Sequence, residues 1–292
     1  MHKEETGQVI SIAKGGVGNQ LFIFGAGKAL AENLGYKHFI DNETGFISDS
    51  YKRSFLLDNF GVSSEILPKQ LKSFSNLRSP KHKLLRSWNK ILPLNLRSYI
   101  AESHNVCPTQ LANLESKRKK IYLNGNWCNE QFFLKHRELI YGELSIPKPK
   151  DTKNEEILAK IQNSENSVFI HVRRVRYKSK LDLNYYIDAV QKLLSLVDNC
   201  KFFLFADDLS WAKENFKNLV EFVPIEHNAN NELADLWLMS NCRHAILANS
   251  SFSWWGAWLG RKNDKKRVVI GPDNEKWPIK TSMNWRKLHF EF

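Results

Sequence analysis

The chain has 292 residues, a length that suits two domains of ordinary size, each with a core of its own. It carries 43 Lys and Arg against 31 Asp and Glu, and the net charge of +12 favours an anionic partner without choosing among nucleic acid, an acidic membrane surface and a phosphorylated small molecule. No apolar run approaches the roughly 18 residues of a membrane span and the 4 cysteines form no CxxC pair, so we expect a cytoplasmic protein without a membrane span, a zinc site or a disulfide framework.

The chain opens with a predicted strand over residues 8–13, a glycine turn and a helix. Gly16 and Gly18 permit close backbone approach, and a helix that starts near Asn19 presents free N–H groups to an anion or a polar group. As a dinucleotide fingerprint the loop is incomplete, because GxGxxG needs a third glycine where Leu21 stands. On the glycines alone, a tight turn without a ligand is favoured over a binding loop.

Residues 69–99 contain eight Lys or Arg and no Asp or Glu. Within them Pro80 suits the first turn of a helix and Pro93 ends it. The helix has an apolar stripe at Leu84, Leu85, Trp88, Ile91 and Leu92, with Lys81, Lys83, Arg86 and Lys90 largely outside it. Two alternatives stay open. The stripe packs on the core of the first domain, or the helix lies on an anionic membrane surface where a lipid-linked glycan is presented.

Pro147, Pro149 and the polar run that follows them predict the domain boundary, which gives domains of 1–150 and 151–292. Beyond the boundary, strands alternate with helices. The predicted strands cover 168–172, 201–206, 221–223, 245–248 and the RVVIGP segment, and the predicted helices cover 184–197, a turn or two around Trp211, 232–240 and the NSSFSWWGAWLG segment. This alternation predicts a doubly wound parallel sheet.

The strand in SVFIHVRR is apolar on both faces and ends in His171, Arg173 and Arg174. Ligands of open α/β sheets bind beyond the carboxyl ends of the strands, and two guanidinium groups there suit a phosphate or a diphosphate. A surface ion pair just past a core strand is an equally weighted alternative on this stretch alone.

A second strand end carries groups that suit an anion. Asn249, Ser250, Ser251 and Ser253 follow the strand at 245–248 and open a helix, so hydroxyls and backbone N–H groups gather there. The alternative role of the serines is to cap the helix. We expect three tryptophans of this helix to pack against the sheet: Trp254, Trp255 and Trp258. Two such strand ends in one half of the chain favour a ligand site.

Four motifs in this order resemble the α-1,2-fucosyltransferases, glycosyltransferase family 11. They are GGVGNQLF at 15–22, HVRR at 171–174, DLWLMSNCRHAILANSSFSWWGAWL at 235–259 and VIGPDNEKWP at 269–278. The resemblance implies an α/β, GT-B-like fold of two Rossmann-like domains that face each other across a cleft. It also implies that the second domain holds GDP-fucose and that an acceptor sugar, commonly galactose, lies on the side of the first. The family pattern HxRRxDY is broken here at Arg176, so the role of that acid cannot be transferred.

By the same resemblance, Arg173, Arg174 and Asn19 are catalytic, with the arginines on the β-phosphate of the leaving group. The implied donor-binding residues are His171, Gly16, Gly18, Gln20, Asn249, Ser250, Ser251, Ser253 and Asp235. The transfer of L-fucose to a 2-hydroxyl should invert the anomeric carbon. No metal or cofactor is expected, since the sequence has no DxD motif and the diphosphate already has cationic partners. The sequence does not identify the catalytic base.

The implied acceptor is an oligosaccharide or a lipid-linked glycan, as in bacterial surface polysaccharide synthesis, and the expected location is the cytoplasm, peripherally at the inner face of the membrane. Two other classes of function remain open. Because Arg176 breaks the family pattern, one alternative is a nucleotide-binding regulatory protein without transferase activity. The positive charge leaves room for a basic nucleic-acid-binding protein, although no RRM, KH or helix-turn-helix signature accompanies it.

Overall fold

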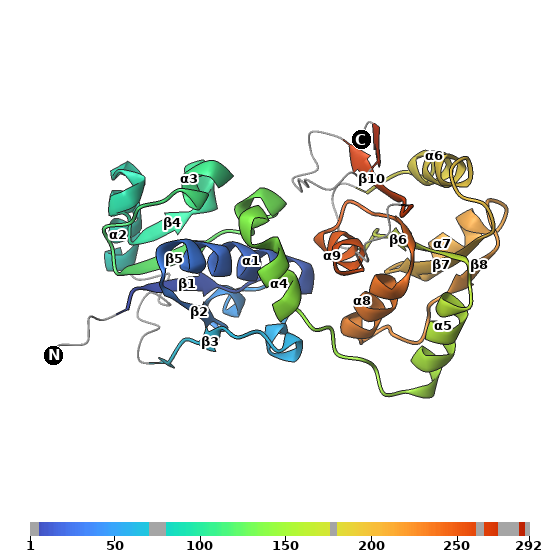
Figure 1. The fold of residues 1–292 in the computed structure, drawn as a ribbon, viewed down its shortest axis with the longest axis horizontal. Helices are drawn as coiled ribbons and strands as arrows, with labels where there is room; N and C mark the ends of the chain where they lie inside the picture. Colours follow the sequence, from blue (N-terminus) through green and yellow to red (C-terminus); the bar gives the residue numbers. More distant parts are fainter. Residues whose placement is uncertain (1–5, 70–79, 176–179, 261–265, 274–285, 290–292) are drawn as a thin grey trace. The chain divides into compact units, whose positions relative to one another are not determined.

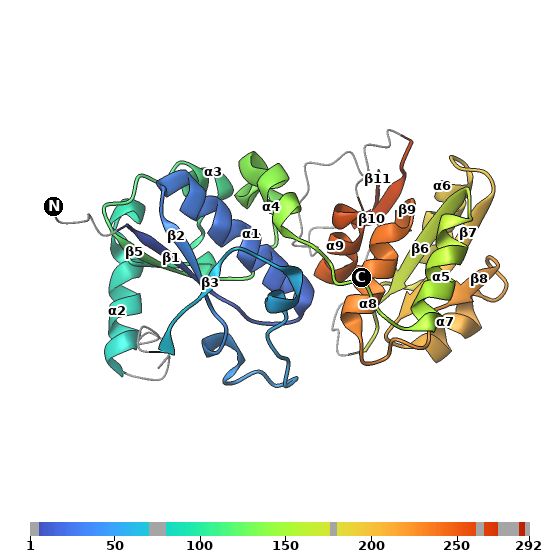
Figure 2. The ribbon, with the colours of Figure 1, turned by 60° about the horizontal axis from the view of Figure 1, so that its bottom comes forward.

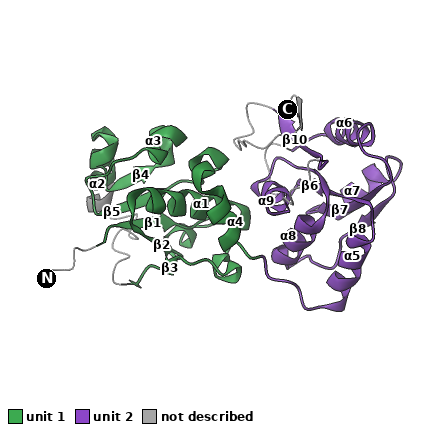
Figure 3. Cartoon of the chain, in the orientation of Figure 1, with its two compact units in different colours: residues 1–145, 279–282 green, residues 146–278, 283–292 purple. Residues whose placement is uncertain are grey.

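The computed structural model describes residues 6–69, 80–175, 180–260, 266–273 and 286–289. The chain divides into two compact units, the described residues up to Ser145 and those from Ile146 onward (Figure 3). Each unit is a parallel β-sheet flanked by helices (Figure 1), so the expectation of two Rossmann-like α/β domains is confirmed. Among the described residues, no helix is both long enough and apolar enough to cross a membrane.

The sheet of unit 1 has five parallel strands in the order β3-β2-β1-β5-β4. Its strands are β1 (Gln8–Ile12), β2 (Lys37–Asp41), β3 (Glu65–Ile66), β4 (Tyr99–Ala101) and β5 (Lys120–Asn124). Its α-helices are α1 (Val17–Leu34), α2 (Pro80–Ile91), α3 (Pro108–Ala112) and α4 (Arg137–Glu143). Val9 of the central strand pairs with His38 on one side and Ile121 on the other, which puts β1 in the middle of the core.

The glycine turn fixes where α1 begins. Gly15 has a φ of +75°, a backbone conformation that side chains with a Cβ rarely adopt, and Gly16 is the N-cap residue. The helix therefore starts at Val17, two residues before the predicted start near Asn19. Gly35, with a φ of +64°, ends it and donates its backbone N–H to the carbonyls of the last turn.

Three short helical pieces lie between β5 and the domain boundary. Two 3-10 turns come first, η6 (Glu130–Phe132) and η7 (Leu134–His136), and the α-helix begins only at Arg137. The sequence did not single out β2, β3 and β4, whose short runs lie among polar residues and carry no clear alternation.

The sheet of unit 2 has six parallel strands in the order β11-β10-β9-β6-β7-β8. Its strands are β6 (Asn166–Val172), β7 (Cys200–Ala206), β8 (Phe222–Pro224), β9 (His244–Ile246), β10 (Val269–Asp273) and β11 (Arg286–His289). Its helices are α5 (Thr152–Gln162), α6 (Leu183–Leu194), α7 (Leu209–Phe216), α8 (Glu232–Asn241) and α9 (Ser251–Leu259). Part of the polar run at the boundary forms the first turn of α5. The Asp151 side chain caps this helix by accepting the Asn154 N–H.

Helices cover both faces of this sheet. Alternate residues of β6, namely Val168, Ile170 and Val172, pack with buried side chains of α6 and α7. On the other face α5, α8 and α9 lie side by side (Figures 1 and 2). The three tryptophans of α9 are 0 to 1% exposed and contact one another at ring centroid distances of 4.9 to 6.0 Å, so they are core residues of unit 2.

Candidate functional site

The order of the strands in unit 2 brings three polar segments to one edge of the sheet. β9, β6 and β7 are neighbours and run parallel, so the residues that follow them lie at the same carboxyl edge. Arg173 and Arg174 follow β6, Asp207 follows β7, and Asn249 with Ser250 follows β9. This edge is where open α/β sheets bind ligands.

Asp207 organises the arginine segment. Its Oδ2 lies 3.2 Å from Arg173 Nε, its Oδ1 accepts the Arg174 N–H at 2.7 Å, and Oδ2 also accepts the Val175 N–H at 3.0 Å. The carboxylate thus fixes the turn after β6 and orients the first guanidinium. The Arg173 side chain still keeps 39% of its surface exposed, which leaves the remaining N–H groups of its guanidinium within reach of an anion.

The two arginines have different surroundings. The Arg174 guanidinium carbon lies 3.7 Å from the ring centroid of Trp211, a cation–π contact, and Nη1 donates to the Leu181 carbonyl at 3.5 Å. Trp211 stands in the first turn of α7, whose N-cap is Asp208. Arg174 is therefore held toward α7, whereas Arg173 is held by Asp207.

His171 is 4% exposed, and its ring faces Phe252 of α9 at a centroid distance of 5.6 Å. Burial, with a further contribution from the charge of Arg173, lowers the pKa of His171 to about 3, so the ring is neutral at pH 7. Its Nδ1 has no hydrogen-bond partner among the residues that the structure describes. A buried polar atom normally has a hydrogen-bond partner, so Nδ1 is available to one that the protein does not supply.

The serines of the second strand end have different roles. Ser250 is the N-cap of α9 and accepts the Phe252 N–H at 3.3 Å. Ser253 is fully buried and its hydroxyl is directed to the Ala248 and Ser250 carbonyls, so the geometry gives it a structural role in place of the predicted donor contact. Asn249 is 5% exposed and Ser251 is half-buried, and both stand at the start of the helix. The backbone N–H groups of this first turn point toward the carboxyl edge.

Asp235 lies in the first turn of α8, which follows the carboxyl end of β8. Its Oδ1 accepts the Asn228 side-chain amide at 3.0 Å, and Asn228 in turn bonds the fully buried Asn154. Burial raises the pKa of Asp235 to about 7, the Asn228 amide opposes the rise, and the charge of Glu232 adds to it. The carboxyl therefore titrates near neutral pH.

The glycine-loop residues belong to unit 1. Gly16 is the N-cap of α1, and Gly18 is buried in the first turn of the helix. The Asn19 side chain lies close to Gly15, because a Cβ added at Gly15 would lie 2.8 Å from Asn19 Nδ2. Gln20 is fully buried. Its amide nitrogen donates to the Gly15 and Ser54 carbonyls and its oxygen accepts the Leu56 N–H, each at 2.9 Å. These bonds fasten the 54–56 segment to the loop, so the geometry gives Gln20 a structural role where the sequence predicts a donor contact.

The carboxyl edge of the unit 1 sheet holds a polar cluster that the sequence did not reveal. Lys14 Nζ donates to Asn124 Oδ1 at 3.0 Å, and Asn124 Nδ2 donates to the Tyr99 hydroxyl at 2.5 Å. Glu102 accepts the N–H groups of Asn126 and Trp127 at 2.7 and 3.1 Å. Burial lowers the pKa of Lys14, and the neighbouring charge of Glu102 opposes that shift. Lys14 follows β1, Glu102 follows β4, and Asn124 is the last residue of β5, so the signal that could have found them is the shared edge of adjacent strands.

Trp127 in this cluster has a φ of +53°, in the left-handed region that bulky residues avoid. The Glu102 carboxylate accepts the Trp127 N–H and so stabilises this strained turn. Strain of this kind costs about 1 to 3 kcal/mol and persists where the surroundings enforce it, most often at ligand sites.

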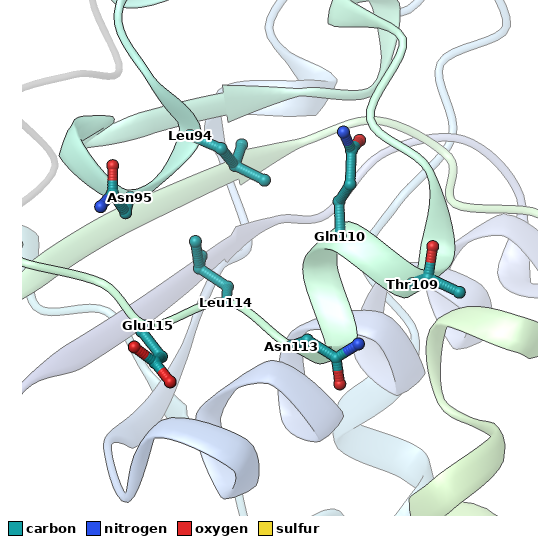
Figure 4. A pocket seen from close by; sticks show the side chains of 7 residues that line it. All are labelled: Leu94, Asn95, Thr109, Gln110, Asn113, Leu114 and Glu115. Carbon is teal, nitrogen blue, oxygen red and sulfur yellow. The ribbon is translucent and has the colours of Figure 1, made fainter.

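A separate hollow of about 540 Å³ lies elsewhere in unit 1 (Figure 4). It is lined by Leu94, Asn95, Thr109, Gln110, Asn113, Leu114 and Glu115. None of the predicted site residues lines it, and its walls carry one carboxylate and no cation, which does not suit an anionic donor. Among the described residues, no group of three or more His, Cys, Asp or Glu is arranged to hold a metal ion. Arg176 and Tyr177, which bear on the family pattern, lie outside the described residues.

Comparisons with known proteins agree with the motif resemblance. The sequence profile described as Glycosyl transferase family 11 matches residues 59–284. An α-1,2-colitosyltransferase of Escherichia coli is 31% identical over 282 residues, which cover 90% of this chain and 91% of that protein. The O-antigen biosynthesis glycosyltransferase WbnK of the same species is 26% identical over 306 residues, which cover 91% and 94%.

The fold has a counterpart among solved structures. The fucosyltransferase NodZ from Bradyrhizobium matches with a TM-score of 0.57 at 15% identity, over 86% of this chain and 92% of that one. NodZ, an α-1,6-fucosyltransferase, has also been co-crystallized with GDP. At this identity the match shows the fold alone, and it assigns the two parallel-sheet units to the GT-B type that the sequence predicted.

Proposed function

Because the chain belongs to glycosyltransferase family 11, we propose that it transfers L-fucose from GDP-fucose to the 2-hydroxyl of an acceptor sugar. The supporting observation is the arginine segment of unit 2, where Asp207 orients an accessible Arg173 at the carboxyl edge beside the start of α9. A guanidinium, backbone N–H groups and the unpartnered nitrogen of a buried His171 make an edge that suits a diphosphate. Family membership favours this function over the nucleic-acid-binding alternative.

The proposed chemistry is the departure of GDP from an oxocarbenium-like fucosyl group. Negative charge grows on the β-phosphate as the glycosidic bond breaks, and a fixed guanidinium stabilises it more in the transition state than in the ground state. Arg173 takes this role. Arg174, held by Trp211, shapes the turn and adds positive potential. The acceptor hydroxyl attacks from the opposite face, which inverts the anomeric carbon, and neither a metal nor a cofactor takes part.

His171 and Asp235 complete the proposed donor side. His171 is neutral at pH 7, so its Nδ1 can accept or donate one hydrogen bond without placing a second positive charge beside Arg173. Asp235 adds a carboxyl group at the start of α8. NodZ, which shares the fold, has been crystallized with GDP, and this supports a guanine nucleotide as the leaving group.

We assign the acceptor to the polar cluster of unit 1. Lys14, Asn124 and Asn126 place an ammonium group and two amides at the carboxyl edge, and such groups bind sugar hydroxyls. A relative at 26% identity is named for O-antigen biosynthesis, which supports a bacterial surface glycan as the acceptor. The four cysteines are free thiols, as a cytoplasmic protein requires.

Colitose is a second candidate for the transferred sugar, because the relative at 31% identity is named a colitosyltransferase. Colitose is L-fucose without its 3-hydroxyl. A site that hydrogen-bonds this hydroxyl rejects the deoxy sugar by about 10⁴-fold or more, whereas an apolar site discriminates by only about 10- to 200-fold.

The experiment that tests the proposal supplies GDP-fucose and GDP-colitose in parallel to the purified protein with galactose-terminated oligosaccharides. The linkage of the product is read by NMR spectroscopy. The proposal expects an α-1,2-linked fucosyl product and a higher kcat/KM for GDP-fucose. A higher kcat/KM for GDP-colitose makes colitose the substrate, and transfer or hydrolysis of neither donor supports the non-catalytic alternative.

A further inference from the structure

Helix α2 (Pro80–Ile91) exposes three apolar side chains. Leu84 is 62% exposed, Trp88 is 59% exposed and Ile91 is 76% exposed. Their spacing of four and three residues puts them on one side of the helix, and we call them the α2 stripe. These three side chains therefore do not pack on the core of unit 1, which favours the second of the two alternatives that the sequence left open.

Polar contacts attach α2 to its unit. Asn89 is 5% exposed, and its Oδ1 accepts the N–H groups of Ser98 and Tyr99 at 2.9 and 3.0 Å, which ties the helix to the start of β4. Arg97 donates to the Leu92 and Lys90 carbonyls at 2.8 and 3.0 Å and so satisfies the end of the helix. Asn89 thus faces inward and the stripe faces outward, on a helix that lies beside the edge strand β4 (Figure 1).

The charge around the stripe limits what can cover it. Residues 69–99 hold eight Lys or Arg and no Asp or Glu, and among them Lys90 is exposed and Arg86 lies 6.0 Å from the ring centroid of Tyr99. A second copy of this helix would bring equal positive charges together, which opposes self-association through the stripe. A partner that covers the α2 stripe must therefore offer an apolar interior to the stripe and negative charge to the Lys and Arg residues beside it.

An anionic lipid surface has both properties. Leu and Ile side chains insert among acyl chains, and Trp is enriched at the boundary between head groups and hydrocarbon. Lys and Arg beside the helix attract acidic head groups. We propose that α2 docks the protein peripherally on an anionic membrane, with the α2 stripe inserted into the interface. This docking does not depend on the proposed transfer reaction, because its readout is lipid binding.

The test is co-sedimentation of the full-length protein with vesicles of phosphatidylglycerol and phosphatidylcholine, and with vesicles of phosphatidylcholine alone, at low and high salt. The stripe variant replaces Leu84, Trp88 and Ile91 with Ala. The charge variant replaces Lys81, Lys83 and Lys90 with Glu and leaves Arg86 on Tyr99. Each variant should bind anionic vesicles at least about tenfold more weakly than the wild type, because each removed contact is worth about a factor of five or more.

Two matched controls remove equivalent groups elsewhere. One replaces three other exposed apolar residues, Ile47, Leu139 and Leu194, with Ala. The other replaces three exposed lysines of unit 2, Lys150, Lys160 and Lys192, with Glu, and so makes the same change in net charge. Both controls should bind vesicles as the wild type does. Thermal unfolding checks that every variant is folded. If the stripe variant is unfolded, the single substitution Trp88→Ala takes its place.

The proposal predicts that wild-type protein sediments with anionic vesicles at low salt and is released at high salt. It is overturned if the wild type stays in the supernatant, if the stripe variant binds as well as the wild type, or if the controls lose as much binding. It is also overturned if sedimentation velocity without lipid shows a dimer that the stripe variant abolishes, since the occupant is then a second copy of the chain.

Discussion

Asp207 holds the proposed phosphate-binding arginine, and its replacement tests the organisation of the donor edge. Asp207→Asn keeps the shape of the side chain and one acceptor oxygen. Its amide nitrogen, however, is a donor. In one orientation it faces both Arg173 Nε and the Val175 N–H, and in the other it faces the Arg174 N–H, so in either case it meets a donor. The substitution therefore removes the negative charge opposite the Arg173 guanidinium and one hydrogen bond of the turn that positions it.

The size of the effect follows from the exposure of the pair. A hydrogen bond to a charged group contributes about 1.5 to 3 kcal/mol, and solvent screening favours the lower end of this range because Arg173 is 39% exposed. We expect a loss of about 1.5 kcal/mol in GDP binding, which is about a tenfold rise in Kd. Isothermal titration calorimetry with GDP measures it directly.

Asp208→Asn is the matched control. It also removes one negative charge, one residue along the chain, but Asp208 only caps α7 by accepting the Trp211 N–H, and Asn caps a helix about as well. Its GDP affinity should stay within about twofold of wild type. In an Arg173→Ala background, Asp207→Asn should cost almost nothing more, because Asp207 acts through that arginine. Wild-type affinity in Asp207→Asn, or an undiminished effect in the Arg173→Ala background, would refute the reasoning.

Three further predictions concern the donor site. Arg174→Ala should lower turnover at least about tenfold, since a charge-assisted contact is worth roughly 1.5 to 3 kcal/mol. Trp211→Leu should also lower turnover, because it releases Arg174. Unchanged rates with GDP-fucose in both variants would show that Arg174 is not part of the site. Chelation with EDTA should leave transfer unchanged, and a loss restored by manganese or magnesium would show that a metal is required. The folded-state pKa of Asp235, about 7, lies above its unfolded value, so its contribution to stability falls as the pH rises from about 4 through 7. Asp235→Asn should therefore gain stability relative to wild type at pH 8 compared with pH 5, as measured by urea unfolding, and a pH-independent difference would contradict the raised pKa.

The parts of unit 2 that the sequence predicted well are those with strong local patterns. The apolar runs that became β6 and β7 carry a clear pattern: both strands end at the predicted residue and begin one or two residues earlier. The alternation of strands with helices after them was also predicted, although the helix predicted over 184–197 ends three residues earlier, at Leu194. The serines before α9 were ambiguous between capping and binding. In the structure Ser250 caps α9, and the Ser253 hydroxyl donates to a main-chain carbonyl. These two roles depend on the geometry of the turn, which the sequence pattern does not give.

Other parts could not be predicted because they depend on contacts between distant segments. Asp207 is separated from Arg173 by 34 residues, and only the pairing of β6 with β7 brings the two together. Gln20 looked like a ligand contact beside the glycines, but its partners at Ser54 and Leu56 lie in a segment with no clear pattern. The periodicity of α2 predicted the helix but not which side of it faces inward, because the buried anchor is a polar residue, Asn89.

The central claim is that Arg173 at the carboxyl edge of unit 2 binds the diphosphate of the donor. Calorimetric binding of GDP and of guanosine to wild type and to Arg173→Ala tests it most directly. The account predicts that wild type binds GDP at least about tenfold more tightly than guanosine, and that Arg173→Ala loses most of this difference while its affinity for guanosine is unchanged. An equal loss for both ligands, or the same preference for GDP in the variant, would contradict it.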